Sequence, residues 1–382
     1  MDRRRELDSV RGLAAFAVVL YHTLALNSGS FQAGLDLGPI ASPIVRILAY
    51  SPLHIVWIGA EAVIIFFVLS GFVLTRSAMK TRFSWEAYYP SRLFRLYAPM
   101  VGAIILTWVI YRLADHSPSP LNHDALSPVL EDYPGQTMLL DATLLGGNSV
   151  QLGVLWSLQW EVIFSLMLPV YIMLGRYYAR AAGMFAALLC LAGWYYNVQA
   201  ASYLPMFFIG TLLATRWTRI ASAFKFLGAT HWRSVLSGTA LLSLSACGIT
   251  SYFVFGRWIG QSGMPARVIT IPFVLLGVVL LLILVQEWPP LRAFMTRRVF
   301  TALGTISFSL YLVHRPIVIA AAYYFHPGRS ATAVGIVASV VVAVVFYYVV
   351  EKPAHGLSRR IAAAVRARET HAAPEALAQR TG

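Results

Sequence analysis

The chain has 382 residues, of which 58% are hydrophobic and only 12% are charged, and its mean hydropathy is +0.66. Soluble domains are close to half apolar and about a quarter charged, so this chain has too little charge for a water-compatible surface. The composition excludes a soluble enzyme, a disordered chain and a fibrous repeat. It predicts an all-α polytopic integral membrane protein, a helical bundle whose surroundings are the lipid bilayer.

The net charge is +14, from 30 Lys and Arg against 16 Asp and Glu. In a membrane protein such an excess reflects basic cytoplasmic loops, so no nucleic-acid partner is expected. Cys190 and Cys247 both lie inside apolar runs. They predict neither a disulfide framework nor a metal-ligand cluster, and no metal is expected.

Ten stretches are apolar enough to form membrane-spanning helices, which need about 20 residues each. In chain order they cover residues 9–28, 53–75, 94–113, 152–174, 181–198, 201–217, 233–255, 266–287, 301–325 and 331–351. Lys and Arg collect in the loops of one side, whereas the longest loop of the other side, residues 114–151, holds five acidic residues and no Lys or Arg. The positive-inside rule therefore predicts a multi-pass protein of the cytoplasmic (inner) membrane with both termini in the cytoplasm. Residues 354–382 are expected to form a basic, partly disordered tail that starts as a helix over Leu357–Arg368.

Ionisable residues inside spans are costly, so each is a hypothesis of function. The candidates are Arg11, His22, Glu61, Glu161, His314 and Arg315. Arg11 and His22 share a face of the first span and lie about 16 Å apart along it. Counted from the span ends, His22, Glu61, Glu161 and His314 fall at similar depth, where one site can form.

Polar stripes accompany two of these residues. Ser157, Glu161 and Ser165 recur every fourth residue on the fourth span, and Tyr311 shares a face with His314 on the ninth. The alternative to a functional site is a structural polar network that holds the helices together. A single buried histidine is most simply explained by a hydrogen bond to a backbone carbonyl.

Arg92 and Arg95 follow the second span and are three residues apart, so on a helix both guanidinium groups face one way. Such a pair is suited to grip phosphates. It is equally suited to stop translocation and to contact anionic lipids. The spacing alone leaves both interpretations open.

Several motifs together resemble the acyltransferase family 3 membrane proteins. They are LDSVRGLA at residues 7–14, followed in the same span by His22, EAV at 61–63, FFVLSGF at 66–72, RLFR at 92–95, WSLQWE at 156–161, SLYLVHRP at 309–316 and EKP at 351–353. The resemblance covers about residues 6–355, so residues 1–353 are expected to form the acyltransferase domain. Ile64 departs from the family pattern because many members have Asp there, and Arg315 stands where an aromatic residue is common.

The resemblance implies transfer of an acyl group, most often acetyl, from cytoplasmic acyl-CoA to a hydroxyl of a carbohydrate or glycoconjugate acceptor, usually at the outer face. It implies that His22 is the catalytic histidine, Arg11 its companion and Glu161 a further required acid. It also implies that Arg92 and Arg95 form the donor-side pair. A carboxylate is expected to orient the His22 ring. We further expect the acceptor side to be formed by His314, Tyr311, Glu61 and Ser157.

Two other functions fit the same residues. A proton-coupled transporter also needs buried Glu and His, and a membrane sugar sensor without catalysis needs a polar pocket. Chemistry that depends on coenzyme A in isolated membranes separates the first function from both. The sequence leaves the acceptor, the acyl length and the oligomeric state undetermined.

Overall fold

The protein is described here by a computed structural model, which describes residues 5–378 except 82, 114–132, 145–148, 150, 229–231 and 262–265. Every regular element in that part of the chain is helical. The α-helices are α1 (Arg5–Asn27), α2 (Gly29–Leu35), α3 (Pro43–Tyr50), α4 (Ala60–Ala78), α5 (Trp85–Leu113), α6 (Gly135–Thr143), α7 (Leu155–Tyr177), α8 (Ala179–Tyr196), α9 (Gln199–Thr215), α10 (Trp217–Ala223), α11 (Trp232–Ile249), α12 (Ser251–Gln261), α13 (Ala266–Glu287), α14 (Pro289–Met295), α15 (Arg298–Phe325), α16 (Arg329–Phe346) and α17 (Lys352–Ala378). Short 3-10 turns cover Pro52–Trp57 (η1) and Lys225–Gly228 (η3), and a π-turn covers Tyr347–Glu351 (η4).

The polytopic helical bundle predicted from the sequence is confirmed, but the number of spans differs. Each of the ten expected stretches overlaps a helix. Within the described residues, seven helices are long and apolar enough to cross a membrane, or eight if α11 and α12, which meet at a bend of 50°, form one span. The two that fall short are α8 and α9, with 18 and 17 residues, close to the shortest length that crosses the hydrocarbon core.

Two span boundaries move in ways that affect the site. The second span was expected from residue 53, but Ser51 and Pro52 start a 3-10 turn there and α4 begins only at Ala60. Glu61 therefore lies in the first turn of α4 and not deep inside it. In contrast, α5 begins at Trp85, nine residues before the expected span, so the Arg92–Arg95 segment belongs to the spanning helix itself.

Close backbone contacts set the helices that carry the candidate residues against one another. A Cβ at Gly12 of α1 would lie 2.4 Å from the backbone N of Gly304 in α15. A Cβ at Gly71 of α4 would lie 2.1 Å from the carbonyl oxygen of Phe207 in α9. Such approaches need small residues, as is usual for helix packing in membranes. They fix the spacing of α1 against α15 and of α4 against α9.

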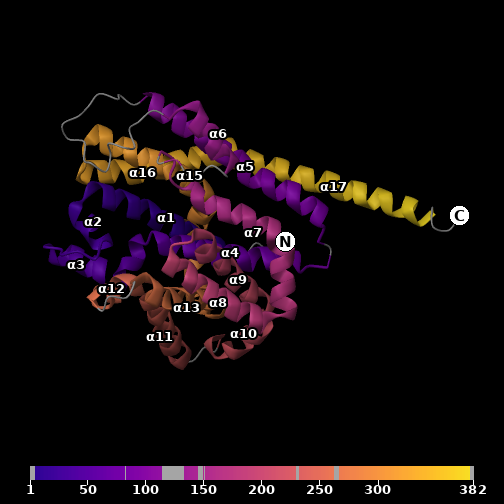
Figure 1. The fold of residues 1–382 in the computed structure, drawn as a ribbon, viewed down its shortest axis with the longest axis horizontal. Helices are drawn as coiled ribbons and strands as arrows, with labels where there is room; N and C mark the ends of the chain where they lie inside the picture. The colour runs from indigo at the N-terminus through magenta and orange to yellow at the C-terminus, as the bar shows by residue number, and fades with distance from the viewer. Residues whose placement is uncertain are drawn as a thin grey trace.

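The C-terminal helix α17 continues from α16 through the π-turn and projects beyond the bundle, next to α5 (Figure 1). Two hydrogen bonds tie it to the first part of α5. Ser358 Oγ donates to the Ser91 carbonyl at 2.7 Å, and Ser84 Oγ donates to Glu369 Oε1 at 2.6 Å. The helix reaches Ala378, so it is longer than the predicted Leu357–Arg368.

Candidate active site

An ion pair between α5 and α7 lies at one end of the candidate site. Arg92 Nη2 donates to Glu161 Oε1 at 2.6 Å, and the two side chains are only 11% and 16% exposed. Ser70 of α4 donates to the same Glu161 oxygen at 3.2 Å, and Arg92 Nε donates to Ser165 Oγ at 3.2 Å. Hydrogen bonds between ionised groups are about twice as strong as neutral ones, so this pair joins three helices firmly. The carboxylate of Glu161 thus holds Arg92 in this structure, and its role as a required acid stays a prediction.

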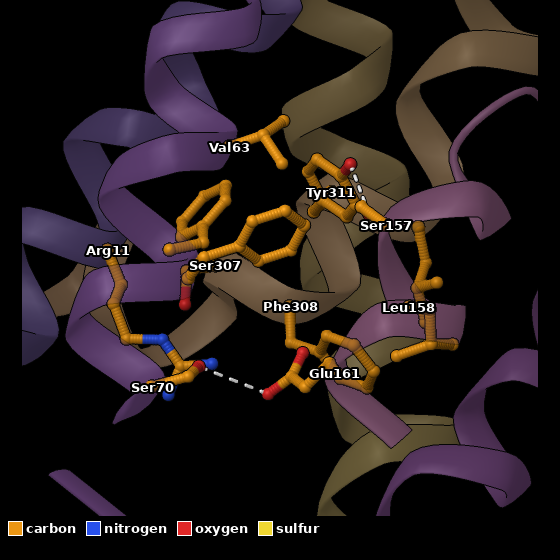
Figure 2. A pocket seen from close by; sticks show the side chains of 12 residues that line it. Arg11, Val63, Ser70, Ser157, Leu158, Glu161, Ser307, Phe308 and Tyr311 are labelled. Carbon is orange, nitrogen blue, oxygen red and sulfur yellow. Dashed lines mark hydrogen bonds between the residues drawn. The ribbon is translucent and has the colours of Figure 1, made fainter. Parts of the chain in front are cut away.

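A partly open cavity with about 470 Å³ of empty space extends from this ion pair between α1, α4, α7 and α15. It is lined by Arg11, Val63, Phe66, Phe67, Ser70, Ser157, Leu158, Glu161, Ser307, Phe308, Tyr311 and Leu312. Figure 2 shows Arg11, Ser70 and Glu161 at one end and the Ser157–Tyr311 hydrogen bond, 2.7 Å long, at the other. The walls between the two ends are mainly aromatic and aliphatic, so the cavity is a narrow apolar passage with a charged end and a hydroxyl end.

Two histidines lie beyond the hydroxyl end. The ring centroids of His22 in α1 and His314 in α15 are 5.3 Å apart, and the Tyr311 ring lies 6.0 Å from His314. The Nδ1 atom of His314 lies 2.9 Å from the Tyr311 carbonyl. Since a carbonyl only accepts hydrogen bonds, Nδ1 carries the proton of the neutral ring and the buried Nε2, which has no hydrogen-bond partner, carries the lone pair. Tyr21 meets His22 edge-on at 5.0 Å.

Glu61 does not join this site. It is 3% exposed, it does not line the cavity, and its Oε2 has no hydrogen-bond partner. Its charged and polar surroundings include Arg267 and Tyr21. The depth predicted for Glu61 was wrong, because the delayed start of α4 places Glu61 in the first turn of that helix.

The structure therefore divides the predicted residues into two groups joined by the cavity. Arg11, Arg92 and Glu161 lie at the charged end, whereas Ser157 and Tyr311 lie at the hydroxyl end, next to the histidine pair. The similar depth expected for the ionisable residues holds for the two histidines only. Arg95 is exposed beside the charged end, where its charge neighbours include Arg11 and Arg92.

Two residues near the charged end were not predicted as part of the site. Glu351, 3% exposed, accepts from the backbone N–H of Ser309 in α15 at 3.0 Å and from the Ser309 hydroxyl. His355 lies one turn later on α17, with Nε2 at 3.6 Å from Glu351 Oε1. Glu351 opens the EKP motif, which is the signal in the sequence that points to this position.

Arg315 places a positive charge beside the histidine pair. Its guanidinium packs on Gly153, where φ is +60° and a Cβ would lie 2.4 Å from the guanidinium carbon, and its Nη1 approaches the Gly153 carbonyl at 3.5 Å. The side chains around it are those of Tyr21, His22, Tyr111, Tyr311 and His314. Within the described residues no carboxylate lies within ion-pair distance of Arg315. An anionic group bound near the histidines would meet this charge.

Comparison with known proteins gives the family. A family model described as an acyltransferase domain matches residues 4–348, nearly the whole chain. The chain belongs to acyltransferase family 3. It is 30% identical over 193 residues to the acyltransferase MdmB of Streptomyces mycarofaciens, which is 48% of this chain and 46% of that protein.

A second relative of this family 3 acyltransferase is nodulation protein 10 of Rhizobium leguminosarum bv. viciae, 24% identical over 206 residues, which is 46% of this chain and 55% of that protein. The chain thus matches about half the length of both curated relatives. No solved structure matches it. Family and fold together describe a polytopic membrane protein of acyltransferase family 3.

Proposed function

We propose that this family 3 acyltransferase moves an acyl group, acetyl in the simplest case, from cytoplasmic acyl-CoA to a hydroxyl of a carbohydrate or glycoconjugate at or beyond the outer face of the cytoplasmic membrane. The observation that carries the proposal is the cavity, which runs from Arg11 and the Arg92–Glu161 ion pair to Tyr311, whose ring lies 6.0 Å from His314 of the histidine pair. Donor phosphates need the first end, and deprotonation of a hydroxyl needs the second.

The donor is proposed to bind at Arg11, Arg92 and Arg95. Phosphates are too strongly hydrated to enter the bilayer, so they stay at the charged end, where guanidinium groups bind them with paired hydrogen bonds. The long pantetheine arm is largely uncharged and suits the apolar walls formed by Phe66 and Phe308. The thioester then lies toward Tyr311, close to the histidines.

His22 is proposed as the general base. A neutral imidazole takes the proton of the acceptor hydroxyl as its oxygen attacks the thioester carbonyl carbon, and a tetrahedral oxyanion forms. Collapse of this intermediate breaks the C–S bond and releases the CoA thiolate, which receives the proton. The ring of His314 lies next to that of His22, and its Nδ1 is tied to a backbone carbonyl, so His314 is proposed to position the His22 ring or to pass the proton onward. Tyr311 and Ser157 are proposed to contact the substrates next to them, and Glu61 to lie farther out on the acceptor path.

The proposed orientation follows from the same requirement. Because CoA is a cytoplasmic molecule, the charged end of the cavity faces the cytoplasm, and α1 and α17 then place both termini there. The excess of Lys and Arg in the loops of that side agrees with this orientation.

A proton-coupled transporter and a sugar sensor remain the alternatives. Both would use the buried histidines, but neither needs arginines converging at a passage, and family membership favours acyl transfer. Consumption of acetyl-CoA with acetyl transfer to a membrane-extractable acceptor separates the enzyme from both.

The test is acetyl transfer from radiolabelled acetyl-CoA in isolated membranes, normalised to folded protein. General-base catalysis is worth about 10²–10⁴-fold, so His22→Ala should lose at least that much transfer while acetyl-CoA still binds. His326→Asn is the matched control because His326 is an exposed histidine at the end of α15. Near-normal turnover of the His22 variant would refute the role of His22, and absence of any acetyl-CoA-dependent transfer would refute the function.

A further inference from the structure

The helix α17 is fixed against the part of α5 that carries the donor-side arginines. The buried side chains of Ala354 and Ser358, one turn apart, share a face, and Ser358 donates to the Ser91 carbonyl. Ser91 is the residue next to Arg92, and Glu369 farther along accepts from Ser84. α17 is therefore not a separate tail but a neighbour of the charged end of the cavity.

Positive charge gathers where α17 meets this end. His355 lies among four guanidinium groups, those of Arg11, Arg92, Arg95 and Arg359. The carboxylates close to them are Glu161, which binds Arg92, and Glu351, which accepts from Ser309. Both of these carboxylates are already engaged, Glu161 by Arg92 and Glu351 by Ser309.

Three of these arginines have no fixed partner. Within the described residues, no hydrogen bond or ion pair is made by the side chains of Arg11, Arg95 or Arg359, and Arg95 and Arg359 are exposed. Guanidinium groups that gather near one side chain, His355, and have no fixed partner are suited to bind a ligand with several phosphates.

We propose that α17 forms a wall of the acyl-donor site, and that Arg359 binds the 3′-phosphate of the CoA ribose while His355 packs beside it. The proposal rests on the proposed function, because it assumes that acyl-CoA is the donor. It follows from the position of Arg359, which is exposed one turn beyond His355 on α17, while the arginines of the bundle, Arg11, Arg92 and Arg95, lie on the other side of His355, toward the cavity. The diphosphate lies near the pantetheine arm and the 3′-phosphate at the far side of the nucleotide, so the outermost arginine is matched to the outermost phosphate.

The experiment compares binding of CoA and 3′-dephospho-CoA to the full-length protein in nanodiscs of phosphatidylcholine alone, by calorimetry. The unaltered protein should bind CoA more tightly than 3′-dephospho-CoA. Arg359→Ala should weaken CoA binding about ten-fold or more, the effect of a lost charge-assisted hydrogen bond, and leave 3′-dephospho-CoA binding unchanged. Arg359→Lys should retain part of the preference, because the charge stays but the planar fork is lost.

Arg360→Ala is the matched control, since it removes the same charge from the adjacent exposed position, which does not face His355. Equal weakening of both ligands by Arg359→Ala, or the same loss in Arg360→Ala, would overturn the proposal in favour of general charge attraction. A loss that appears only when phosphatidylglycerol is present would assign Arg359 to lipid headgroups instead. Binding of neither ligand by the unaltered protein would refute acyl-CoA as the donor, and both proposals would fall together.

Discussion

The Arg92–Glu161 ion pair predicts a measurable coupling between α5 and α7. Glu161→Gln keeps the shape of the side chain and one acceptor oxygen for Ser70, but it leaves the Arg92 guanidinium without its counter-charge. Arg92→Gln leaves the Glu161 carboxylate in the same position. The double variant Arg92→Gln/Glu161→Gln places two neutral amides opposite each other.

The expected magnitudes follow from the burial of the pair. Breaking a buried ion pair by removing one partner costs about 3–5 kcal/mol, because the remaining charge is left without compensation. At 11% and 16% exposure some solvent reaches both groups, so each single variant should lose about 2–3 kcal/mol of unfolding free energy. The double variant should lose about 1–2 kcal/mol, less than either single variant, which gives a coupling energy of about 2–5 kcal/mol.

The assay is denaturant titration in mixed micelles, with the helical circular dichroism signal followed for all four proteins. Acetyl-CoA binding should fall in both variants that lack Arg92, which separates the stabilising role of the pair from its role at the donor site. A double variant that loses the sum of the two single losses would show that the side chains act independently. The structural role assigned to the pair would then be wrong.

Three further predictions test other parts of the structure. Gly71→Ala should lose about 1–3 kcal/mol of unfolding free energy, because the new Cβ would lie 2.1 Å from the Phe207 carbonyl oxygen. Gly356→Ala, which has open space around it, should be neutral or slightly stabilising in the same titration. Burial lowers the pKa of His54, in the η1 turn, to about 3. The unfolded chain binds this proton from about pH 6.5 downward, so the free energy of unfolding should fall by up to about 1.4 kcal/mol per pH unit as the pH drops from 6.5 toward 3. The variant His54→Gln should show a smaller pH dependence when melting is measured over the same range. Single cysteines placed in residues 114–151 of a variant without native cysteines should react with an impermeant thiol reagent from outside, and cysteines near Arg180 should not; the reverse labelling would invert the proposed orientation.

Helix periodicity and charge were enough to predict the helical bundle and to select candidate residues for a site, but they did not give the partners of those residues. Hydropathy gives the depth of a residue along its own helix, and for His22 and His314 this sufficed, since their rings lie together. It does not give the rotation of one helix against another, so the ion pair between Glu161 and Arg92 could not be predicted. It also assumes that a span starts where the apolar run starts, which failed for Glu61.

The tail escaped prediction for a different reason. The sequence of Leu357–Arg368 predicts a basic helix, and basic helices are typical of membrane surfaces. The contacts that bind α17 to α5 are made by Ser84, Ser91, Ser358 and Glu369, which are far apart in the sequence and polar. No local pattern marks such residues as a packing face.

The π-turn at Tyr347–Glu351 determines how the following helix, α17, is rotated about its own axis. A π-turn holds one residue more than an α-helical turn, so the helix behind it is rotated by about 100° relative to an uninterrupted α-helix. Deleting one residue here would leave the composition and hydropathy of the chain almost unchanged, yet Ser358 would turn away from α5 and Arg359 away from the arginines of the bundle. When C-terminal segments are exchanged between relatives, the position of the junction therefore matters. A junction after Glu351 keeps the rotation of α17 about its axis. A junction inside α16 changes the rotation of the whole of α17 if the two chains differ in length by one residue.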